Sequence, residues 1–222
     1  TKILTYETCN SQNNYLEPAL ANLKDNPIMS KVLAADTSDK SAIRPECFQK
    51  SMETFNASGA FRQCSRDNDA RNAPHLKKAC SSENYVNTTS KSFNAASECL
   101  AGYVAGSSDP EVKRITALSI FTMLNVESGF HVNAISPSGA GGPGQFTQPA
   151  IDTVNKNMQD LKEYLAKSDS PLCKNTLAKV LDNPMDGRPS KSCERINLND
   201  NNPLRNMMYI FAYQASLRRG LG

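Results

Sequence analysis

The chain has 222 residues, with 25 basic and 22 acidic side chains and a formal net charge of +3. A chain of this length can bury about 70% of the surface of its unfolded state, which suits one domain with an appended lobe. The positive and negative charges are too evenly balanced to indicate nucleic-acid binding by themselves, and no apolar run is long enough to span a bilayer. We therefore expect no nucleic-acid partner and no integral membrane segment. The chain begins at Thr1 rather than Met, which we interpret as a processed or trimmed form.

Seven cysteines are spread along the chain without a Cys-x-x-Cys pair, so a zinc site is not expected. We expect three disulfides that each close a short loop and stabilise the fold by about 3 kcal/mol, with Cys9 left unpaired. The expected pairs are Cys47 with Cys64, Cys80 with Cys99, and Cys173 with Cys193. Other pairings stay open, and reduced cysteines in a cytosolic enzyme are the alternative. Disulfides indicate an oxidising compartment, so we expect a periplasmic or secreted protein.

Residues 1–106 are rich in Asn, Ser and Ala, a composition typical of short helices joined by polar loops. An apolar series is interrupted at Asn26-Pro27, where proline should break a helix. Apolar spacing predicts a second helix that ends near Gly59 and a third over residues 93–103. We see no catalytic constellation here. The sequence thus predicts a helical N-terminal lobe, residues 1–106, ahead of a second unit, residues 107–222.

A strong helix signal covers residues 110–127. Asp109 or a serine before it can cap the helix, and Pro110 suits the first helical position. Apolar residues then recur at three- and four-residue spacing over much of the helix surface. We expect this helix to be central, and Gly129 to end it.

Glu127 is the only carboxylate after the first turn of this helix, and it lies at the negative end of the helix dipole. That position opposes ionisation, and an apolar wall of Val126, Phe130 and Val132 would add to the effect. A carboxylic acid that keeps its proton can donate it to a leaving oxygen, as glycoside cleavage requires. A solvated glutamate at a helix end is the alternative.

The residues after this helix form a pattern. Glu127-Ser128-Gly129-Phe130 is followed by Ser136-Pro137-Ser138-Gly139-Ala140, and then by Gly142 and Gln145. The pattern resembles the catalytic signature of soluble lytic transglycosylases and goose-type lysozymes, in which a Glu-Ser pair closes the central helix. A Ser-x-x-Gly-Ala-x-Gly-Leu-Met-Gln segment lines the cleft in that family. This chain departs from the family at Pro143-Gly144, where Leu-Met is usual.

A further match lies near the C-terminus. Residues 202–207, Asn-Pro-Leu-Arg-Asn-Met, resemble the family's Asn-Pro-x-x-Asn-Ile motif, which opens a helix lining the cleft. Residues 212–216, Ala-Tyr-Gln-Ala-Ser, resemble either a later part of that helix or the family's Ala-Tyr-Asn-Ala-Gly motif. Both alignments place Tyr213 near the substrate, and a tyrosine packed in a helical core is the alternative.

The segment between the matches predicts two more helices. One is capped by Thr147 and carries an apolar stripe as far as Leu165, and the other opens at Ser170-Pro171 and runs to Leu181. The polar loop that follows lacks the ligand spacing of a calcium loop. We expect no metal and no cofactor.

The resemblance implies a mainly α fold, a lysozyme-like helical domain with an additional N-terminal helical lobe and a small β-hairpin or none. It implies that Glu127 is the catalytic acid/base. The residues it implies for substrate binding are Ser128, Ser136, Gly142, Gln145, Asn206 and Tyr213. The implied partner is peptidoglycan or a related aminosugar polymer, cleaved by a monomeric enzyme at the MurNAc-GlcNAc β-1,4 bond.

A hydrolase usually needs a second carboxylate about 5–9.5 Å from the first, whereas a lytic transglycosylase can use the acetamido group of its substrate. Asp152, Asp186 and Asp200 are weak candidates for that second group, so we expect anhydro products over reducing ends. The alternatives are a lysozyme or chitosanase acting on de-N-acetylated glycan, and a glycan-binding relative without activity.

Overall fold

The computed structural model describes residues 27–34, 42–58, 83–131, 134, 136, 140–187 and 202–220. The helices are α3 (Pro27–Ala34), α4 (Pro45–Ser58), α6 (Glu83–Ala105), α7 (Pro110–Glu127), α8 (Gln148–Lys156), α9 (Met158–Ala166), the π-helix η2 (Leu172–Leu177), α10 (Ala178–Val180) and α11 (Pro203–Arg218). These ranges contain no β-strand, and an isolated antiparallel bridge joins Gly141 to Phe146. The expected mainly α fold is confirmed. None of the described helices is both long and apolar enough to cross a bilayer.

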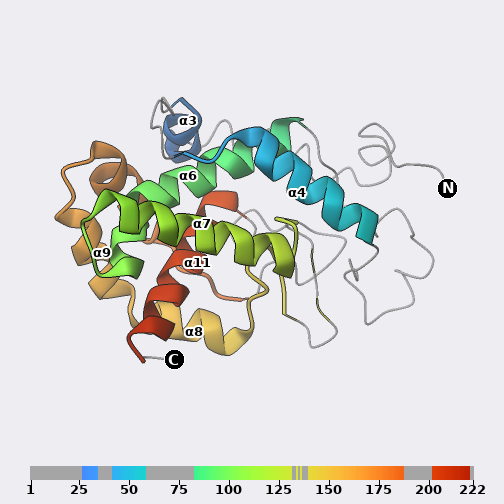
Figure 1. The fold of residues 1–222 in the computed structure, drawn as a ribbon. Helices are drawn as coiled ribbons and strands as arrows, with labels where there is room; N and C mark the ends of the chain where they lie inside the picture. Colours follow the sequence, from blue (N-terminus) through green and yellow to red (C-terminus); the bar gives the residue numbers. More distant parts are fainter. Residues whose placement is uncertain are drawn as a thin grey trace.

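Helix α11 is the centre of the structure. Its first ten residues, 203–212, are all buried. It packs most extensively against α6, and α8 covers another side of it. Helix α7 and α4 pack against α6. In Figure 1, α7 lies in front of α11, with α3 and α4 at the top of the view and α8 at the bottom.

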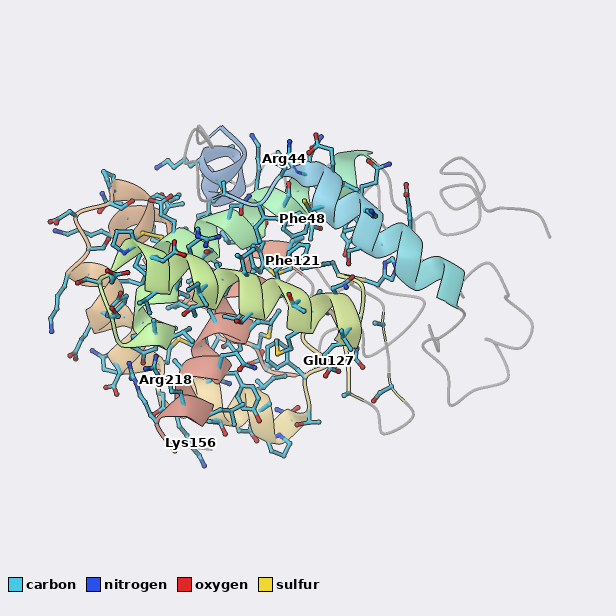
Figure 2. The ribbon with its side chains drawn as sticks, in the orientation of Figure 1. Arg44, Phe48, Phe121, Glu127, Lys156 and Arg218 are labelled. Atoms are coloured by element: carbon cyan, nitrogen blue, oxygen red, sulfur yellow. A yellow bond between two sulfur atoms is a disulfide. The ribbon has the colours of Figure 1, made fainter. Side chains whose placement is uncertain are left out.

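The hydrophobic core is continuous from Val32 in α3 to Ala215 in α11. Four phenylalanines join its parts, with ring centroids 4.8–6.2 Å apart: Phe48, Phe93, Phe121 and Phe130. Figure 2 labels two of them, Phe48 on α4 and Phe121 on α7. The predicted boundary at residue 106 therefore does not correspond to a break in the core. The described helices before it share one core with those after it.

The two predicted helix starts that matter for the site are confirmed. At α7, the Asp109 carboxylate accepts hydrogen bonds from the backbone N–H groups of Glu111 and Val112, both at 2.9 Å. At α11, the side-chain oxygen of Asn202 accepts from the N–H groups of Leu204 and Arg205. Each cap satisfies two donors that a helix start leaves without a partner. Proline occupies the first turn of both helices.

Three other helix predictions need correction. The helix predicted between Thr147 and Leu165 is two helices, α8 and α9, which meet at Asn157. The amide of Asn157 donates to the Thr153 carbonyl at 2.9 Å, a side-chain bond of the kind that competes with helix continuation. The segment opened by Pro171 is largely π-helical, and α6 begins ten residues before the predicted range 93–103.

The structure changes the expected disulfide scheme. Of the three cysteines within the described ranges, Cys99 and Cys173 are bonded to each other, and Cys47 is free and exposed. The bond ties α6 to η2, because η2 packs directly on α6. The predicted pairs Cys47–Cys64, Cys80–Cys99 and Cys173–Cys193 are therefore wrong. They joined cysteines that are close in sequence, whereas the observed pair joins cysteines that helix packing brings together. Cys9, Cys64, Cys80 and Cys193 lie outside the described residues.

Candidate functional site

An open pocket of about 180 Å³ lies where the end of α7 meets the 141–146 turn and α11. Its wall is formed by Met123, Glu127, Gly144, Gln145, Phe146, Ile210, Tyr213 and Gln214. Three residues that the sequence singled out, Glu127, Gln145 and Tyr213, are among them. They come from three segments of the chain.

Glu127 is the last residue of α7 and is exposed (Figure 2). The expected apolar wall around it is wrong for two of its members. Val126 is 70% exposed, because it lies on the outward side of α7, and Phe130 is buried in the aromatic cluster of the core. Val132 lies outside the described residues. Among the residues that the structure describes, neither Val126 nor Phe130 shields this carboxylate from water.

The chain reverses directly after Glu127. Gly129 (φ 54°) and Phe130 (φ 65°) are both in the left-handed region, so α7 ends where glycine was expected to end it. This conformation is costly for Phe130, which has a Cβ. Burial of its ring stabilises the turn, as does the hydrogen bond that the Tyr85 hydroxyl donates to its carbonyl.

Ser128 holds two parts of the site together. It is fully buried, its hydroxyl donates to the Pro143 carbonyl at 2.7 Å, and its oxygen accepts from the Phe130 N–H at 3.1 Å. In place of the expected sugar contact, Ser128 joins the end of α7 to the turn that carries Gln145. It positions the site rather than lining it.

Gln145 shapes its own turn. Its side-chain amide donates to the carbonyls of Gly142 (2.8 Å) and Ala134 (3.2 Å), and its φ of 48° is unusual for a residue with a side chain. Gly142 is buried in the same turn, has a φ of 72°, and donates from its N–H to the Ala134 carbonyl. The structure thus gives Gly142 a backbone role, whereas Gln145 both holds the turn and lines the pocket.

Two more of the expected sugar contacts lie away from the pocket wall. Ser136 is half-buried and exchanges hydrogen bonds with Ala140: its hydroxyl accepts from the Ala140 N–H, and its own N–H donates to the Ala140 carbonyl. Asn206 is fully buried in α11 and donates to the Asn202 carbonyl at 3.1 Å. Both residues support the backbone near the site.

Four further residues of the pocket wall were not predicted from the sequence: Met123, Phe146, Ile210 and Gln214. Met123 precedes Glu127 by four residues and so shares a helix face with it, a signal that was available. Nothing in the local pattern distinguished Ile210 or Phe146 from core residues, because both are almost fully buried.

Gly144 is the second of the two positions, Pro143-Gly144, where the chain departs from the family pattern, and packing explains the glycine. A Cβ built there would lie 2.6 Å from Cγ1 of Ile210 and 3.1 Å from Cε2 of Phe146. Its φ is not in the left-handed region, so the constraint is space and not backbone conformation. The 141–146 turn and α11 are in direct contact here. The methionine usual in the family would not fit this arrangement.

Glu127 is the only carboxylate in the pocket wall as the structure describes it. Asp152 is exposed on α8 and accepts from the Gln148 amide, and Asp186 is also exposed; neither lines the pocket. Asp200 lies outside the described residues. Within the same ranges, no group of three or more His, Cys, Asp or Glu side chains could hold a metal ion.

The fold and the pocket together define a mainly α protein with one carboxylate at an open, largely apolar site. No protein-family model, no curated protein and no solved structure matches the chain. We therefore infer the function from the motif resemblance and from the geometry of the pocket.

Proposed function

We propose that the chain is a peptidoglycan-cleaving muramidase with Glu127 as its general acid/base. The observation that carries the proposal is the convergence of Glu127, Gln145 and Tyr213 on one pocket. Each of them comes from a different segment of the motif resemblance. The resemblance implies that all three lie near the substrate, and their presence in one pocket supports that implication.

In the proposed reaction, Glu127 gives its proton to the glycosidic oxygen as the bond to the anomeric carbon breaks. Positive charge builds up on the sugar as an oxocarbenium-like centre. The ionised Glu127 then removes a proton from the nucleophile and is restored. If the nucleophile is the C6 hydroxyl of the same sugar, the product is a 1,6-anhydro sugar, and if it is water, the product has a reducing end.

An exposed carboxylate must lose its water before it can serve as this acid. Met123 is half-buried in the same pocket wall, so a sugar ring seated there would displace solvent from the carboxylate and from the exposed part of Met123. The substrate completes the site in this proposal. Because Glu127 is the only carboxylate among the described pocket residues, we favour transglycosylation over hydrolysis.

The exposure of Glu127 also favours a second candidate, a protein that binds peptidoglycan without cleaving it. Such a protein needs the pocket and its polar side chains, but it does not need a carboxylic acid that is shielded from water. The two candidates differ in product formation and not in binding.

The test is Glu127→Gln, with Asp152→Asn as a matched control because Asp152 is an exposed carboxylate outside the pocket. Clearing of a peptidoglycan suspension should be abolished in the first variant and kept in the second. Mass spectrometry of the wild-type digest should give anhydro sugars. Tight binding of sacculi with no released product would support the binding protein, and full activity of Glu127→Gln would end the proposal.

We place the protein outside the cytosol, in the periplasm or secreted, where both peptidoglycan and an oxidising environment are found. The Cys99–Cys173 disulfide supports this location, since such bonds persist mainly in oxidising compartments. We propose a monomer, in line with a site formed within one chain.

A further inference from the structure

Met123 places a thioether sulfur in the pocket wall, one helical turn before Glu127 and on the same helix face. Its side chain is half-buried, and its Sδ accepts a hydrogen bond from Nε2 of Gln214 at 3.2 Å. Because Gln214 lines the same pocket, the sulfur atom itself, and not only the carbon stem, lies on the pocket side. A small solute that enters the pocket can therefore reach this sulfur.

The other methionines whose side chains the structure describes differ in their access. Met158 is half-buried at the start of α9 and lies outside the pocket wall. The remaining four are at most 1% exposed: Met52, Met185, Met207 and Met208. Oxidants attack accessible thioethers first, so Met123 and Met158 are the two of this set that should react in the folded protein.

We propose that Met123 is a site of reversible oxidation, where hydrogen peroxide converts the thioether to a sulfoxide and thereby inactivates the pocket. The sulfur forms a bond to one peroxide oxygen as the O–O bond breaks. Sulfur gives up two electrons, and the departing hydroxide takes the proton of the transferred oxygen and leaves as water. The loss of activity rests on the proposed function, whereas the modification itself does not.

Oxidation changes the hydrogen bonding of the pocket wall. A thioether sulfur is a weak acceptor, whereas the sulfoxide is a polar group. An oxygen atom that accepts from the Gln214 amide needs about 2.9 Å to the nitrogen, and the sulfur is already 3.2 Å away, so one of the two side chains must move. Glu127 is one turn away, and its protonated carboxyl can donate to the new oxygen. A proton held in this way is not delivered to the glycosidic oxygen.

The test treats the protein with hydrogen peroxide and follows both the modification and the clearing of a peptidoglycan suspension. Cys47→Ser is the background, because the exposed free thiol of Cys47 would also react. Peptide mapping by mass spectrometry should show one added oxygen at Met123 and Met158 before it appears at the buried methionines. Clearing should slow about tenfold, the order expected when a hydrogen bond to the reacting group is lost, and methionine sulfoxide reductases should restore it.

Three variants isolate Met123 from the other methionines. Met123→Leu removes the sulfur and keeps an apolar side chain of similar volume, so peroxide should not slow it relative to the same variant untreated. Met158→Leu is the matched control, because Met158 is also half-buried but outside the pocket wall, and it should stay as sensitive to peroxide as the background. Met123→Gln puts a polar group in place of the sulfoxide and should be slow without any peroxide.

Equal sensitivity of Met123→Leu and the background would overturn the inference and leave the glycan-cleaving function standing. If circular dichroism showed that this variant does not fold, the background protein would decide: an activity loss that does not follow the oxidised fraction of Met123 would overturn the inference. Oxidation of the buried methionines ahead of Met123 would also overturn it, and this observation needs no activity. Untreated protein that neither clears nor binds peptidoglycan would instead overturn the proposed function, and peptide mapping would then decide the modification site by itself.

Discussion

Because Gly144 and Ile210 are in tight contact, we predict that Gly144→Ala destabilises the wild type but stabilises a variant in which Ile210 is truncated to alanine. In the wild type, Gly144→Ala places a methyl group 2.6 Å from Cγ1 of Ile210. Ile210 is 2% exposed and is held in α11, so it has little room to move. Overpacking of this kind costs about 1–3 kcal/mol of unfolding free energy.

Truncation of the neighbour should reverse the effect. Ile210→Ala alone costs about 2–5 kcal/mol, because it leaves a cavity in the core, but it removes both isoleucine atoms that crowd position 144. In that background Gly144→Ala fills space, and it also restricts the unfolded chain, which stabilises by about 0.4–1 kcal/mol. The effect on the unfolded chain is common to both backgrounds, so the coupling energy reports the relieved overpacking and should be at least about 1 kcal/mol.

The assay is urea unfolding of the wild type, both single variants and the double variant, followed by far-UV circular dichroism. Gly106→Ala is the control. Gly106 has a φ of 62° and open space around its Cβ position, so its alanine variant should cost the same in both backgrounds. Equal costs for Gly144→Ala in the two backgrounds would refute the contact and, with it, the described seating of the 141–146 turn on α11.

Three further predictions concern stability. Replacing Cys99 and Cys173 with alanine should lower the unfolding free energy by about 4.5 kcal/mol in the chain-entropy model, because the two residues are 74 positions apart in the sequence. Urea unfolding measures this loss, and replacing the exposed free Cys47 with serine is the control that should leave stability unchanged. A loss below about 1 kcal/mol in the double variant would contradict the prediction. Burial lowers the pKa of His131 from 6.5 to about 3, so as pH falls through this window the unfolded state binds a proton that the folded state does not, and stability should fall by up to about 5 kcal/mol. A urea midpoint whose pH dependence is the same in His131→Asn as in the wild type would refute this. Asp109→Ala should cost about 1 kcal/mol in thermal or urea unfolding, and Asp109→Asn much less, since only the asparagine still caps α7; equal losses would argue against the cap.

Local rules predicted the start and the end of α7, where a side-chain cap and the apolar spacing agreed. The Asp109 cap could be predicted from the sequence because it depends on residues within three positions of the helix start, whereas the helix after Asn202 was expected only from the motif resemblance. Gly129 was likewise predictable as the end of α7. Asn157 was not, because the stripe of apolar residues continues across it and only its side-chain bond to the backbone reveals the break.

The features that could not be predicted from the sequence depend on contacts between segments that are far apart in the chain. The pairing of Cys99 with Cys173 follows from η2 packing on α6, which no spacing rule contains. The same limit applies to Ser128: its residue type suited a sugar contact, but its position relative to Pro143 makes it a buried link. Exposure of Val126 could not be judged either, since an apolar stripe wider than the contact surface leaves one edge in water.

The hydroxyl bridge from Ser128 to Pro143 has a consequence for how the site works. It fastens the helix that ends in Glu127 to the turn that carries Gln145, so the two side chains belong to one rigid frame. Movement of that turn toward a ligand would pull the end of the helix with it. A ligand would therefore meet a pocket whose width at this point is set before it binds.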